Sequence, residues 1–284
     1  MVKIKKLTLQ NYCGYRNSTF DFTTNGIVNP INVFFGPNGN GKSSLLDALN
    51  ILSMSHRLCT KDNELYFRKL TYHEDYDPSY AKFQTSVHPM KIEGIFETDK
   101  GDKRVLITDK GVEVNEIERF SWGVVYSIDA DHPMNLQRFQ LHDELSEKFL
   151  DMAKLIYGFD CKLDQLCESF ERGDKEHYYK DFIINKVRKG EATKVHFRRM
   201  SDGERKIATL LSSLCDPTYI QNIDIVSIDN IEQHIYFRRH AAMIDKLLST
   251  FPGKQFICTT HSGTLIEHVK DKYGKMCLYD LETI

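Results

Sequence analysis

The sequence predicts an α/β fold with a parallel central sheet, and three observations indicate it. An almost continuously apolar stretch, residues 31–35, runs into a glycine-rich turn and then into a segment with leucines at helical spacing. In the second half of the chain, apolar strands typical of burial on both faces alternate with helical segments. The 284 residues are 41% hydrophobic, which is enough to fill a core and excludes wholesale disorder.

The first half of the chain is expected to form strands around one helix. Strands are expected at 3–10, 18–22, 31–35, 91–97, 104–108 and 124–128. The helix begins at Lys42 and places Leu45, Leu49 and Leu52 on one face. Residues 57–89 are polar and show no period, so we expect a variable loop insertion there.

The second half is expected to alternate strands and helices. Helices are expected at 141–156, 201–214 and 237–248, strands at 223–228, 255–260 and 275–281, and a hairpin from 179–187 and 193–197. Because strands that alternate with helices usually pair in parallel, this half predicts the core of the central sheet.

Charge and cysteine content exclude several classes of protein. The 38 basic and 40 acidic residues leave a net charge of −2, which excludes a nucleic-acid binder held by bulk charge. No apolar run approaches the roughly 20 residues that a membrane span needs, and the N-terminus is typical of a strand rather than a secretory signal. The seven cysteines are scattered and contain no C-x-x-C pair, so we expect a reducing, cytoplasmic location.

Residues 36–43 carry the strongest chemical signal. They match G-x-x-x-x-G-K-[ST] in full, and the candidate nucleotide-binding residues are Gly36, Pro37, Asn38, Gly39, Asn40, Gly41, Lys42, Ser43 and the following Ser44. The glycines let backbone N–H groups face one concavity, to which the helix N-terminus adds its own. Lys42 is expected to reach the β- and γ-phosphates of a nucleotide, and the Ser43 hydroxyl to bind Mg²⁺.

Two polar residues follow neighbouring buried strands. Asp229 ends the strand at 223–228, and in a protein with this loop such an acid sits beside the loop serine and the metal. Ser43 and Asp229 are therefore the predicted metal ligands. His261 follows the next strand, and because parallel strands end at the same edge, we expect it beside Asp229. A structural histidine and an ordinary strand-end Asp are the alternatives.

The segment Ser201-Asp202-Gly203-Glu204 begins a predicted helix. Ser201 and Glu204 form an S-x-x-E capping box, which explains the serine and the glutamate but not the glycine between them. A glycine makes sense where something must approach the backbone closely, and an exposed helix N-terminus attracts anions. All four residues are candidates for nucleotide binding.

Together these motifs resemble the ABC-type ATPases, and within them the RecF, Rad50, SMC and overcoming-lysogenization-defect (OLD) group. The resemblance covers residues 1–53 and 197–284 and includes the opening strand. It implies a P-loop ATPase head: a mixed sheet flanked by helices, with an antiparallel N-terminal β portion and an inserted helical and hairpin lobe. It also implies a Walker A loop at 36–43, a signature at 201–204, the Walker B acid Asp229 and the switch histidine His261. In that family two subunits sandwich two ATP molecules, and each signature contacts the ATP held by the other subunit.

This resemblance predicts a discontinuous organisation. Residues 1–135 and 200–284 are expected to form one ATP-binding core around a single sheet, with an inserted lobe at 136–199 and the loop insertion at 57–89. The stretch between Ser43 and Ser201 is too short for long coiled-coil arms and lacks heptads, and too few residues follow His261 for an OLD-type nuclease. We expect a minimal head that acts with a separate effector, such as a nuclease.

The residue after the Walker B acid departs from the family pattern. Asn230 stands where the family usually has a glutamate that polarises the attacking water, and an amide cannot accept a proton at neutral pH. The sequence therefore predicts slow hydrolysis, unless Glu232 or His261 replaces the missing acid. The resemblance also implies a glutamine that senses the metal after the strand at 124–128, and Gln137 and Gln140 are the candidates.

The expected activity is ATP hydrolysis coupled to a DNA-directed function, in repair or in defence against phage, by a homodimer that forms with ATP and Mg²⁺. Local basic residues in the hairpin are candidates for DNA contact: Lys186, Arg188, Lys189 and Lys194. A solvated hairpin face or a γ-phosphate sensor near Ser201 explains the same charges. The alternative functions are a non-hydrolysing ATP-locked scaffold, which Asn230 favours, and a transporter ATPase, which the form of the signature disfavours.

Overall fold

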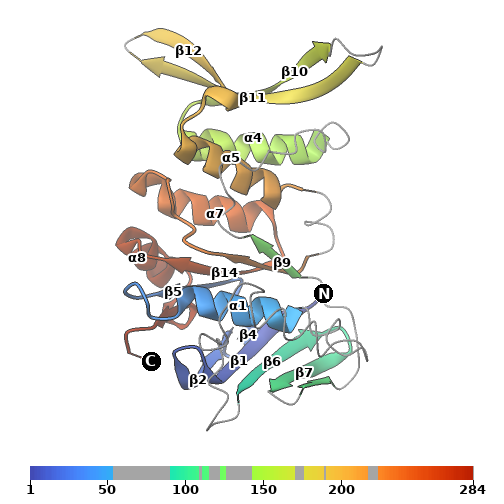
Figure 1. Cartoon of the computed structure of the whole chain (residues 1–284). Helices are drawn as coiled ribbons and strands as arrows, with labels where there is room; N and C mark the ends of the chain where they lie inside the picture. The colour runs from blue at the N-terminus through green and yellow to red at the C-terminus, as the bar shows by residue number, and fades with distance from the viewer. Residues whose placement is uncertain are drawn as a thin grey trace, which may run out of the picture. The chain divides into compact units, whose positions relative to one another are not determined.

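The computed structural model describes residues 1–53, 90–108, 111–114, 122–125, 143–169, 176–188, 190–216 and 223–283 (Figure 1). The chain divides into two compact units. The first unit comprises Met1–Val124, Ile223–Ile231 and Gly253–Ile284, and the second comprises Val125–Asn222 and Glu232–Pro252. Within the described residues no helix is long and apolar enough to cross a membrane.

The central sheet of the first unit is built from strands that are distant in the sequence. Its order is β15 (Leu278–Asp280), β5 (Ile31–Phe35), β14 (Gln255–Thr260), β13 (Ile225–Ile228) and β9 (Trp122–Val125). β13, β14, β5 and β15 pair in parallel, which confirms the predicted parallel core. Every residue of β13 and β14 is buried, because helices or strands cover both faces of such a sheet.

A second, antiparallel sheet lies in the same unit. Its order is β2 (Tyr15–Asp21), β1 (Lys3–Tyr12), β6 (Lys91–Thr98), β7 (Gly101–Thr108) and β8 (Gly111–Val114), and β3 (Thr23–Thr24) pairs with β4 (Ile27–Val28) beside it. The prediction of a single sheet was therefore wrong. β1 buries only Ile4, Leu7, Leu9 and Tyr12, whereas every residue of β13 and β14 is buried. It hydrogen-bonds to β2 and β6 instead of joining the fully buried strands.

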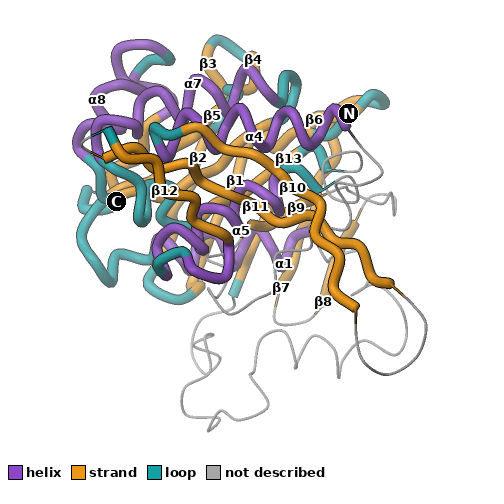
Figure 2. The backbone as a smooth tube through the Cα atoms, turned by 90° about the horizontal axis from the view of Figure 1, so that it is seen from above, coloured by secondary structure: helices purple, strands orange, loops and turns teal. Residues whose placement is uncertain are grey.

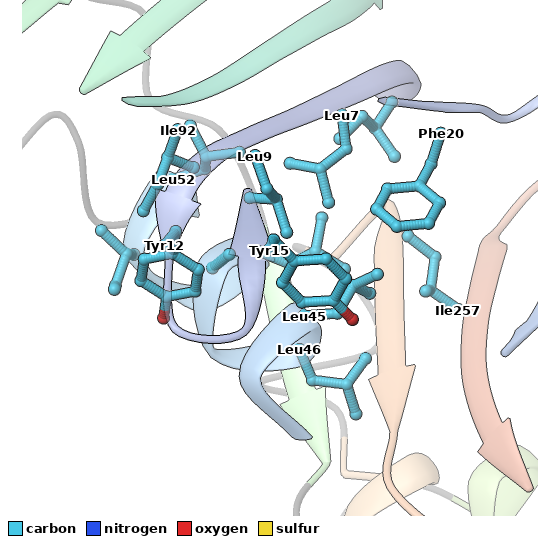
Figure 3. Packing of buried hydrophobic residues seen from close by; sticks show 14 of the residues in the cluster. Leu7, Leu9, Tyr12, Tyr15, Phe20, Leu45, Leu46, Leu52, Ile92 and Ile257 are labelled. Atoms are coloured by element: carbon cyan, nitrogen blue, oxygen red, sulfur yellow. The ribbon is translucent and has the colours of Figure 1, made fainter. Parts of the chain in front are cut away.

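The helix α1 (Lys42–Ser53) anchors the glycine-rich loop to this unit. Leu45, Leu49 and Leu52 are fully buried in a core cluster that also contains residues of β1, β2 and β6. Figure 3 shows Leu45, Leu46 and Leu52 in one cluster with Leu7, Leu9 and Tyr15. Full burial of each leucine contributes about 1.5–3 kcal/mol, so the start of α1 is held by its own apolar face.

The C-terminal part of the first unit contains a helix that the sequence pattern did not predict. α8 (Gly263–Lys272) is capped by Ser262, whose hydroxyl accepts from the Leu265 N–H. The predicted strand at 275–281 begins instead as the 3₁₀ turn η5 (Lys275–Cys277) and continues as β15.

The second unit combines three helices with a three-stranded sheet. α4 (Asp143–Tyr157) packs against α5 (Asp202–Leu214) and α7 (His240–Thr250), and the sheet order is β10 (Asp160–Ser169), β11 (Glu176–Arg188) and β12 (Glu191–His196). Short 3₁₀ turns precede α5 and α7, namely η3 (Phe197–Arg199) and η4 (Phe237–Arg239). β10 and β11 run side by side as a long ribbon (Figure 2).

This arrangement differs from the predicted domain boundaries and adds one strand. α5 and α7 group with the inserted lobe because their apolar faces pack on α4. The predicted hairpin is present as β11 and β12, whereas β10 was missed because its polar-rich sequence gains strand geometry by pairing with β11. The predicted insertion at 57–89 lies outside the described residues.

Candidate nucleotide site

The glycine-rich loop owes its shape to backbone angles that favour glycine. Gly36, Gly39 and Gly41 have φ of +143°, +86° and +85°. A Cβ on Gly41 would lie 3.0 Å from the Tyr15 ring, and the Tyr15 hydroxyl donates to the Gly41 carbonyl at 3.0 Å. Tyr15 comes from the start of β2 and carries no motif, so the sequence pattern could not identify it as a support of the loop.

Lys42 folds back over this loop. Its side chain is 7% exposed, and its ammonium donates to the carbonyls of Gly36 at 2.8 Å and Pro37 at 2.9 Å. On the other side, the Asn40 amide donates to the Leu281 carbonyl, so the segment after β15 supports the loop. The tip, residues 37–39, is exposed, and Ser43 and Ser44 lie in the first turn of α1.

Ser43 and Asp229 are brought together by the fold. The Ser43 hydroxyl donates to Asp229 Oδ2 at 3.1 Å, although 186 positions separate the two residues. Asp229 follows β13 directly, and its Oδ1 accepts a hydrogen bond from the hydroxyl of Thr259, the fifth residue of β14. A carboxylate and a hydroxyl thus face each other at the carboxyl edge of the parallel strands.

Asn230 continues the same turn in a left-handed conformation, with φ of +48°. Its N–H donates to Thr259 Oγ1 at 2.8 Å, and the N–H of Ile231 donates to the Thr259 carbonyl at 3.1 Å. The Asn230 side-chain oxygen is a buried atom without a hydrogen-bond partner among the described residues. A buried acceptor in this state is uncommon and calls for a ligand or water.

The structure describes two of the four other residues predicted for this site. His261 is exposed immediately after β14, at the same sheet edge as Asp229 because β13 and β14 are parallel. Glu232 is half-buried at the start of the second unit's last segment. Gln137 and Gln140 lie outside the described residues.

The signature candidate begins α5 with a complete capping box, as predicted. The Ser201 hydroxyl caps the Glu204 N–H, while Glu204 Oε2 accepts from the Ser201 N–H at 3.0 Å and its hydroxyl at 2.9 Å. Asp202 is exposed and forms an ion pair with Arg205. Local geometry alone therefore explains why the helix starts at this point.

Two residues of other elements in the second unit, Lys186 and Tyr157, contact Glu204 at the start of α5. The ammonium of Lys186, on β11, forms an ion pair with Glu204, and the hydroxyl of Tyr157, at the end of α4, donates to the Glu204 carbonyl at 2.6 Å. Burial alone would raise the pKa of the Glu204 carboxyl, but hydrogen bonds from Lys186 and Ser201 outweigh it and hold that pKa below its ordinary 4.5.

Gly203 has a partner within its own unit. A Cβ on Gly203 would lie 3.2 Å from Nδ1 of His234 and 3.3 Å from its Cγ, so the His234 ring lies against the glycine. His234 has φ of +67°, a conformation uncommon for residues other than glycine. The close approach predicted for this glycine is thus made, at least in part, by an imidazole of the same chain.

The basic hairpin is less available than its sequence indicated. Lys186 is engaged with Glu204, which removes it from the candidate DNA contacts. Lys194 is exposed on β12. Lys189 lies outside the described residues, and the Arg188 side chain is not among those described. Nearby, His196 Nδ1 lies 2.5 Å from Oδ2 of the buried Asp181.

These residues fit magnesium and a nucleotide phosphate. Mg²⁺ prefers hard oxygen ligands and is usually held by one or two protein groups plus phosphates and water, which matches a Ser43 hydroxyl beside an Asp229 carboxylate. No group of three or more His, Cys, Asp or Glu in the described chain could form an all-protein cage. The positive-φ glycines shape a loop suited to an anionic ligand, and the Asn230 oxygen, which can only accept, suits a water or another hydrogen-bond donor beside it.

A protein-family model described as an AAA domain matches residues 6–191, more than half of the chain. The chain belongs to this family. With the motifs above, this AAA-domain match makes the protein an ABC-type P-loop ATPase of the RecF and SMC group.

Sequence relatives support the same assignment. The chain is 26% identical to the Septu protein PtuA of Bacillus mycoides over 91% of this chain and 38% of that protein. It is 26% identical to the DNA replication and repair protein RecF of Bacillus pumilus, over 72% of this chain and 51% of that protein. A segment covering 34% of the chain is 32% identical to the retron Vc95 probable ATPase of Vibrio cholerae. The chain spans 18–51% of the length of these relatives.

Solved structures agree on the fold. An SMC head bound to the C-terminal winged-helix domain of ScpA matches with a TM-score of 0.62 and 16% identity, over 93% of this chain and 91% of that one. The SMC head of Thermotoga maritima matches with a TM-score of 0.53 and 16% identity, over 94% and 92%. This likeness confirms the predicted P-loop ATPase head fold.

Proposed function

We propose that this ATPase binds Mg·ATP between two copies of the chain and hydrolyses it slowly. The observation that supports this most directly is the contact between Ser43 and Asp229, which joins the glycine-rich loop to the carboxyl edge of the parallel strands. In the proposed dimer, the exposed start of α5 in one copy contacts the γ-phosphate held by the loop of the other.

The residues of the first unit bind and orient the nucleotide. The loop N–H groups and the start of α1 contact phosphate oxygens, and Lys42 exchanges its two loop carbonyls for the β- and γ-phosphates. Ser43 and Asp229 hold Mg²⁺, which when bound neutralises charge on the phosphates. For Lys42 the exchange replaces hydrogen bonds from the ammonium to neutral carbonyls by hydrogen bonds to anionic phosphate oxygens, which are stronger.

Asn230 limits the chemical step. Its carboxamide oxygen accepts a hydrogen bond from a water and orients it, but a carboxamide does not take the proton. General-base assistance accounts for about 10²–10⁴-fold in rate, so we infer a long-lived ATP-bound dimer. Positioning and charge stabilisation still permit turnover. Glu232 and His261 are the candidates to supply a base in its place.

The dimer is proposed to control a DNA-directed activity through a separate effector such as a nuclease, in repair or in defence against phage. Relatives named RecF, Septu PtuA and a retron ATPase support this class of role. The partner role of ScpA in the SMC head structure supports an effector that is a distinct protein. Of the four basic residues predicted to contact DNA, Lys194 is the one whose side chain the structure describes as exposed.

A second candidate function is a scaffold that ATP locks without hydrolysis, and Asn230 is the observation that favours it. Steady-state phosphate release with and without double-stranded DNA separates the two. Release above background that depends on Lys42 supports the ATPase, whereas stoichiometric ATP retention without release supports the scaffold.

Dimerisation itself is tested by size-exclusion chromatography with light scattering in Mg·ATP. We expect a dimer with wild-type protein and with Lys6→Ala, an exposed control on β1, but not with Lys42→Ala or Ser201→Arg. Lys42→Ala fails because nucleotide binding is lost, whereas Ser201→Arg retains binding. If Ser201→Arg still dimerises, the composite site is wrong.

A further inference from the structure

Thr259 connects the two residues at the centre of the proposed site. Its side chain is 0% exposed, and its single hydroxyl touches both the Asp229 carboxylate and the Asn230 N–H. The sequence pattern directed attention to His261 two positions later, and no motif distinguishes Thr259 from Thr260.

The direction of these hydrogen bonds follows from the groups themselves. A backbone N–H can only donate, so Thr259 Oγ1 must accept from Asn230 at 2.8 Å. The one hydroxyl hydrogen is then left for Asp229 Oδ1, the other partner at hydrogen-bond distance among the described residues. Because the acceptor and donor roles are both assigned, the hydroxyl cannot reverse.

The two oxygens of the Asp229 carboxylate therefore have different hydrogen-bond partners. Oδ1 is engaged by Thr259 from within the sheet, and Oδ2 faces the Ser43 hydroxyl on the side of the loop. The Thr259 carbonyl also accepts from the Ile231 N–H at 3.1 Å, so the same residue holds the left-handed turn at Asn230 from its backbone and its side chain.

We propose that Thr259 is a positioning residue that selects Oδ2 of Asp229 for the metal and holds Asn230 in its left-handed turn. The inference rests on the proposed function, since it assumes that Mg·ATP binds at Ser43 and Asp229. Removing a group that hydrogen-bonds to a metal ligand and orients it typically lowers metal affinity or activity by about 10–100-fold.

Two substitutions separate the hydroxyl from the bulk of the side chain. Thr259→Val keeps the volume and removes the hydroxyl, whereas Thr259→Ser keeps the hydroxyl and removes a methyl group. A role in packing alone would make Thr259→Ser the more harmful change. A positioning role reverses that order and leaves nucleotide binding in EDTA unchanged for both.

The experiment titrates Mg²⁺, and Mn²⁺ by electron paramagnetic resonance, into each variant with a fluorescent ATP analogue. We expect Thr259→Val to need about 10-fold or more metal for half-saturation, and Thr259→Ser to stay within about threefold of wild type. Equal metal requirements for Thr259→Val and wild type would overturn the inference. If wild-type protein binds no metal-nucleotide at all, the proposed function fails instead.

A second readout needs no ligand. In the nucleotide-free protein, loss of the hydroxyl leaves the Asn230 N–H without its acceptor, so hydrogen exchange over residues 229–231 should accelerate in Thr259→Val but not in Thr259→Ser. Thermal unfolding of both variants shows whether they fold. Unchanged exchange in a folded Thr259→Val protein would contradict the positioning role in the turn.

Discussion

The turn after β13 and the turn that begins α5 are stabilised by different interactions. In the first, buried backbone groups and the Thr259 hydroxyl hold Asp229 and Asn230. In the second, partly exposed side chains hold Ser201 and Glu204, among them the Lys186 ammonium, which is 20% exposed. Both turns carry residues of the proposed nucleotide site, but Ser201 and Asp202 in the second are exposed, whereas Asp229 and Asn230 in the first are half-buried.

This difference predicts which half of the site responds to its surroundings. The partly buried hydrogen bonds of the first turn are shielded from salt more than the ion pair of the second turn. That ion pair joins two charged side chains that are each 20% exposed, so it weakens as ionic strength rises. We therefore expect the affinity of the first unit for nucleotide and metal to change little with salt concentration. Dimerisation through the turn at Ser201–Glu204 is expected to depend more strongly on salt concentration and on binding partners.

The largest expected effect tests the chemistry of the first turn. Asn230→Glu should raise the rate of ATP hydrolysis by about 100-fold or more, because a carboxylate can assist the attacking water. The same change should lower the free energy of unfolding by about 1–2 kcal/mol, since glutamate fits φ of +48° less well than asparagine. Phosphate release and thermal unfolding measure the two effects. A wild-type enzyme that already turns over several times per second and is indifferent to the substitution would contradict slow hydrolysis.

A pair of glycines provides the next comparison. Gly41→Ala should destabilise the protein by about 1–2 kcal/mol and weaken nucleotide binding, because φ is +85° and the new Cβ meets the Tyr15 ring. Gly203→Ala should change stability by less than about 1 kcal/mol, since the helix-propensity gain offsets the displacement of the His234 ring. Calorimetry and nucleotide titration measure both.

Gly203→Ala also separates two roles for this glycine, room for the His234 ring and close approach of the γ-phosphate bound by the partner copy. We expect Gly203→Ala to weaken ATP-dependent dimerisation, because the new Cβ displaces the His234 ring or meets the nucleotide bound by the partner copy. If the glycine serves only the His234 ring, combining Gly203→Ala with His234→Ala should restore dimerisation. If the γ-phosphate of the partner copy must approach the backbone there, the double variant should still fail to dimerise.

A smaller effect is expected at the ion pair that supports the signature turn. Lys186→Met should weaken ATP-dependent dimerisation about three- to tenfold, because Glu204 loses a charged partner, and leave nucleotide binding unchanged. Lys194→Met is the matched control on the same sheet. Analytical ultracentrifugation at low and high salt measures the change, and the wild-type protein should approach Lys186→Met as salt rises. Equal losses in the two variants would point to general charge instead.

The smallest effect concerns pH. Because the pKa of Glu204 lies below its ordinary 4.5, its network stabilises the start of α5 above that pH and is lost as pH falls through the lowered pKa. NMR titration of the Glu204 carboxyl should show this, and in Lys186→Met the midpoint should move upward. A midpoint unaffected by Lys186→Met would mean that the ion pair is absent in solution.

The sequence alone determined the features that depend on near neighbours. The glycine-rich loop, the buried strands before it and before Asp229, and the capping box of α5 all follow from patterns within a few residues. The placement of Asp229 beside Ser43 was predictable from the glycine-rich loop motif, and the parallel pairing of β13, β14 and β5 brings both residues to one sheet edge.

Only the tertiary structure decided which side chains hold those features in place. Tyr15 against Gly41, Thr259 against Asp229 and Lys186 against Glu204 each join residues from different elements. Likewise, β10 and the separation of β1 from the central sheet depend on which strand supplies the hydrogen-bond partner. Local pattern records which face of an element is apolar, but the partner on that face is selected by packing across the whole unit.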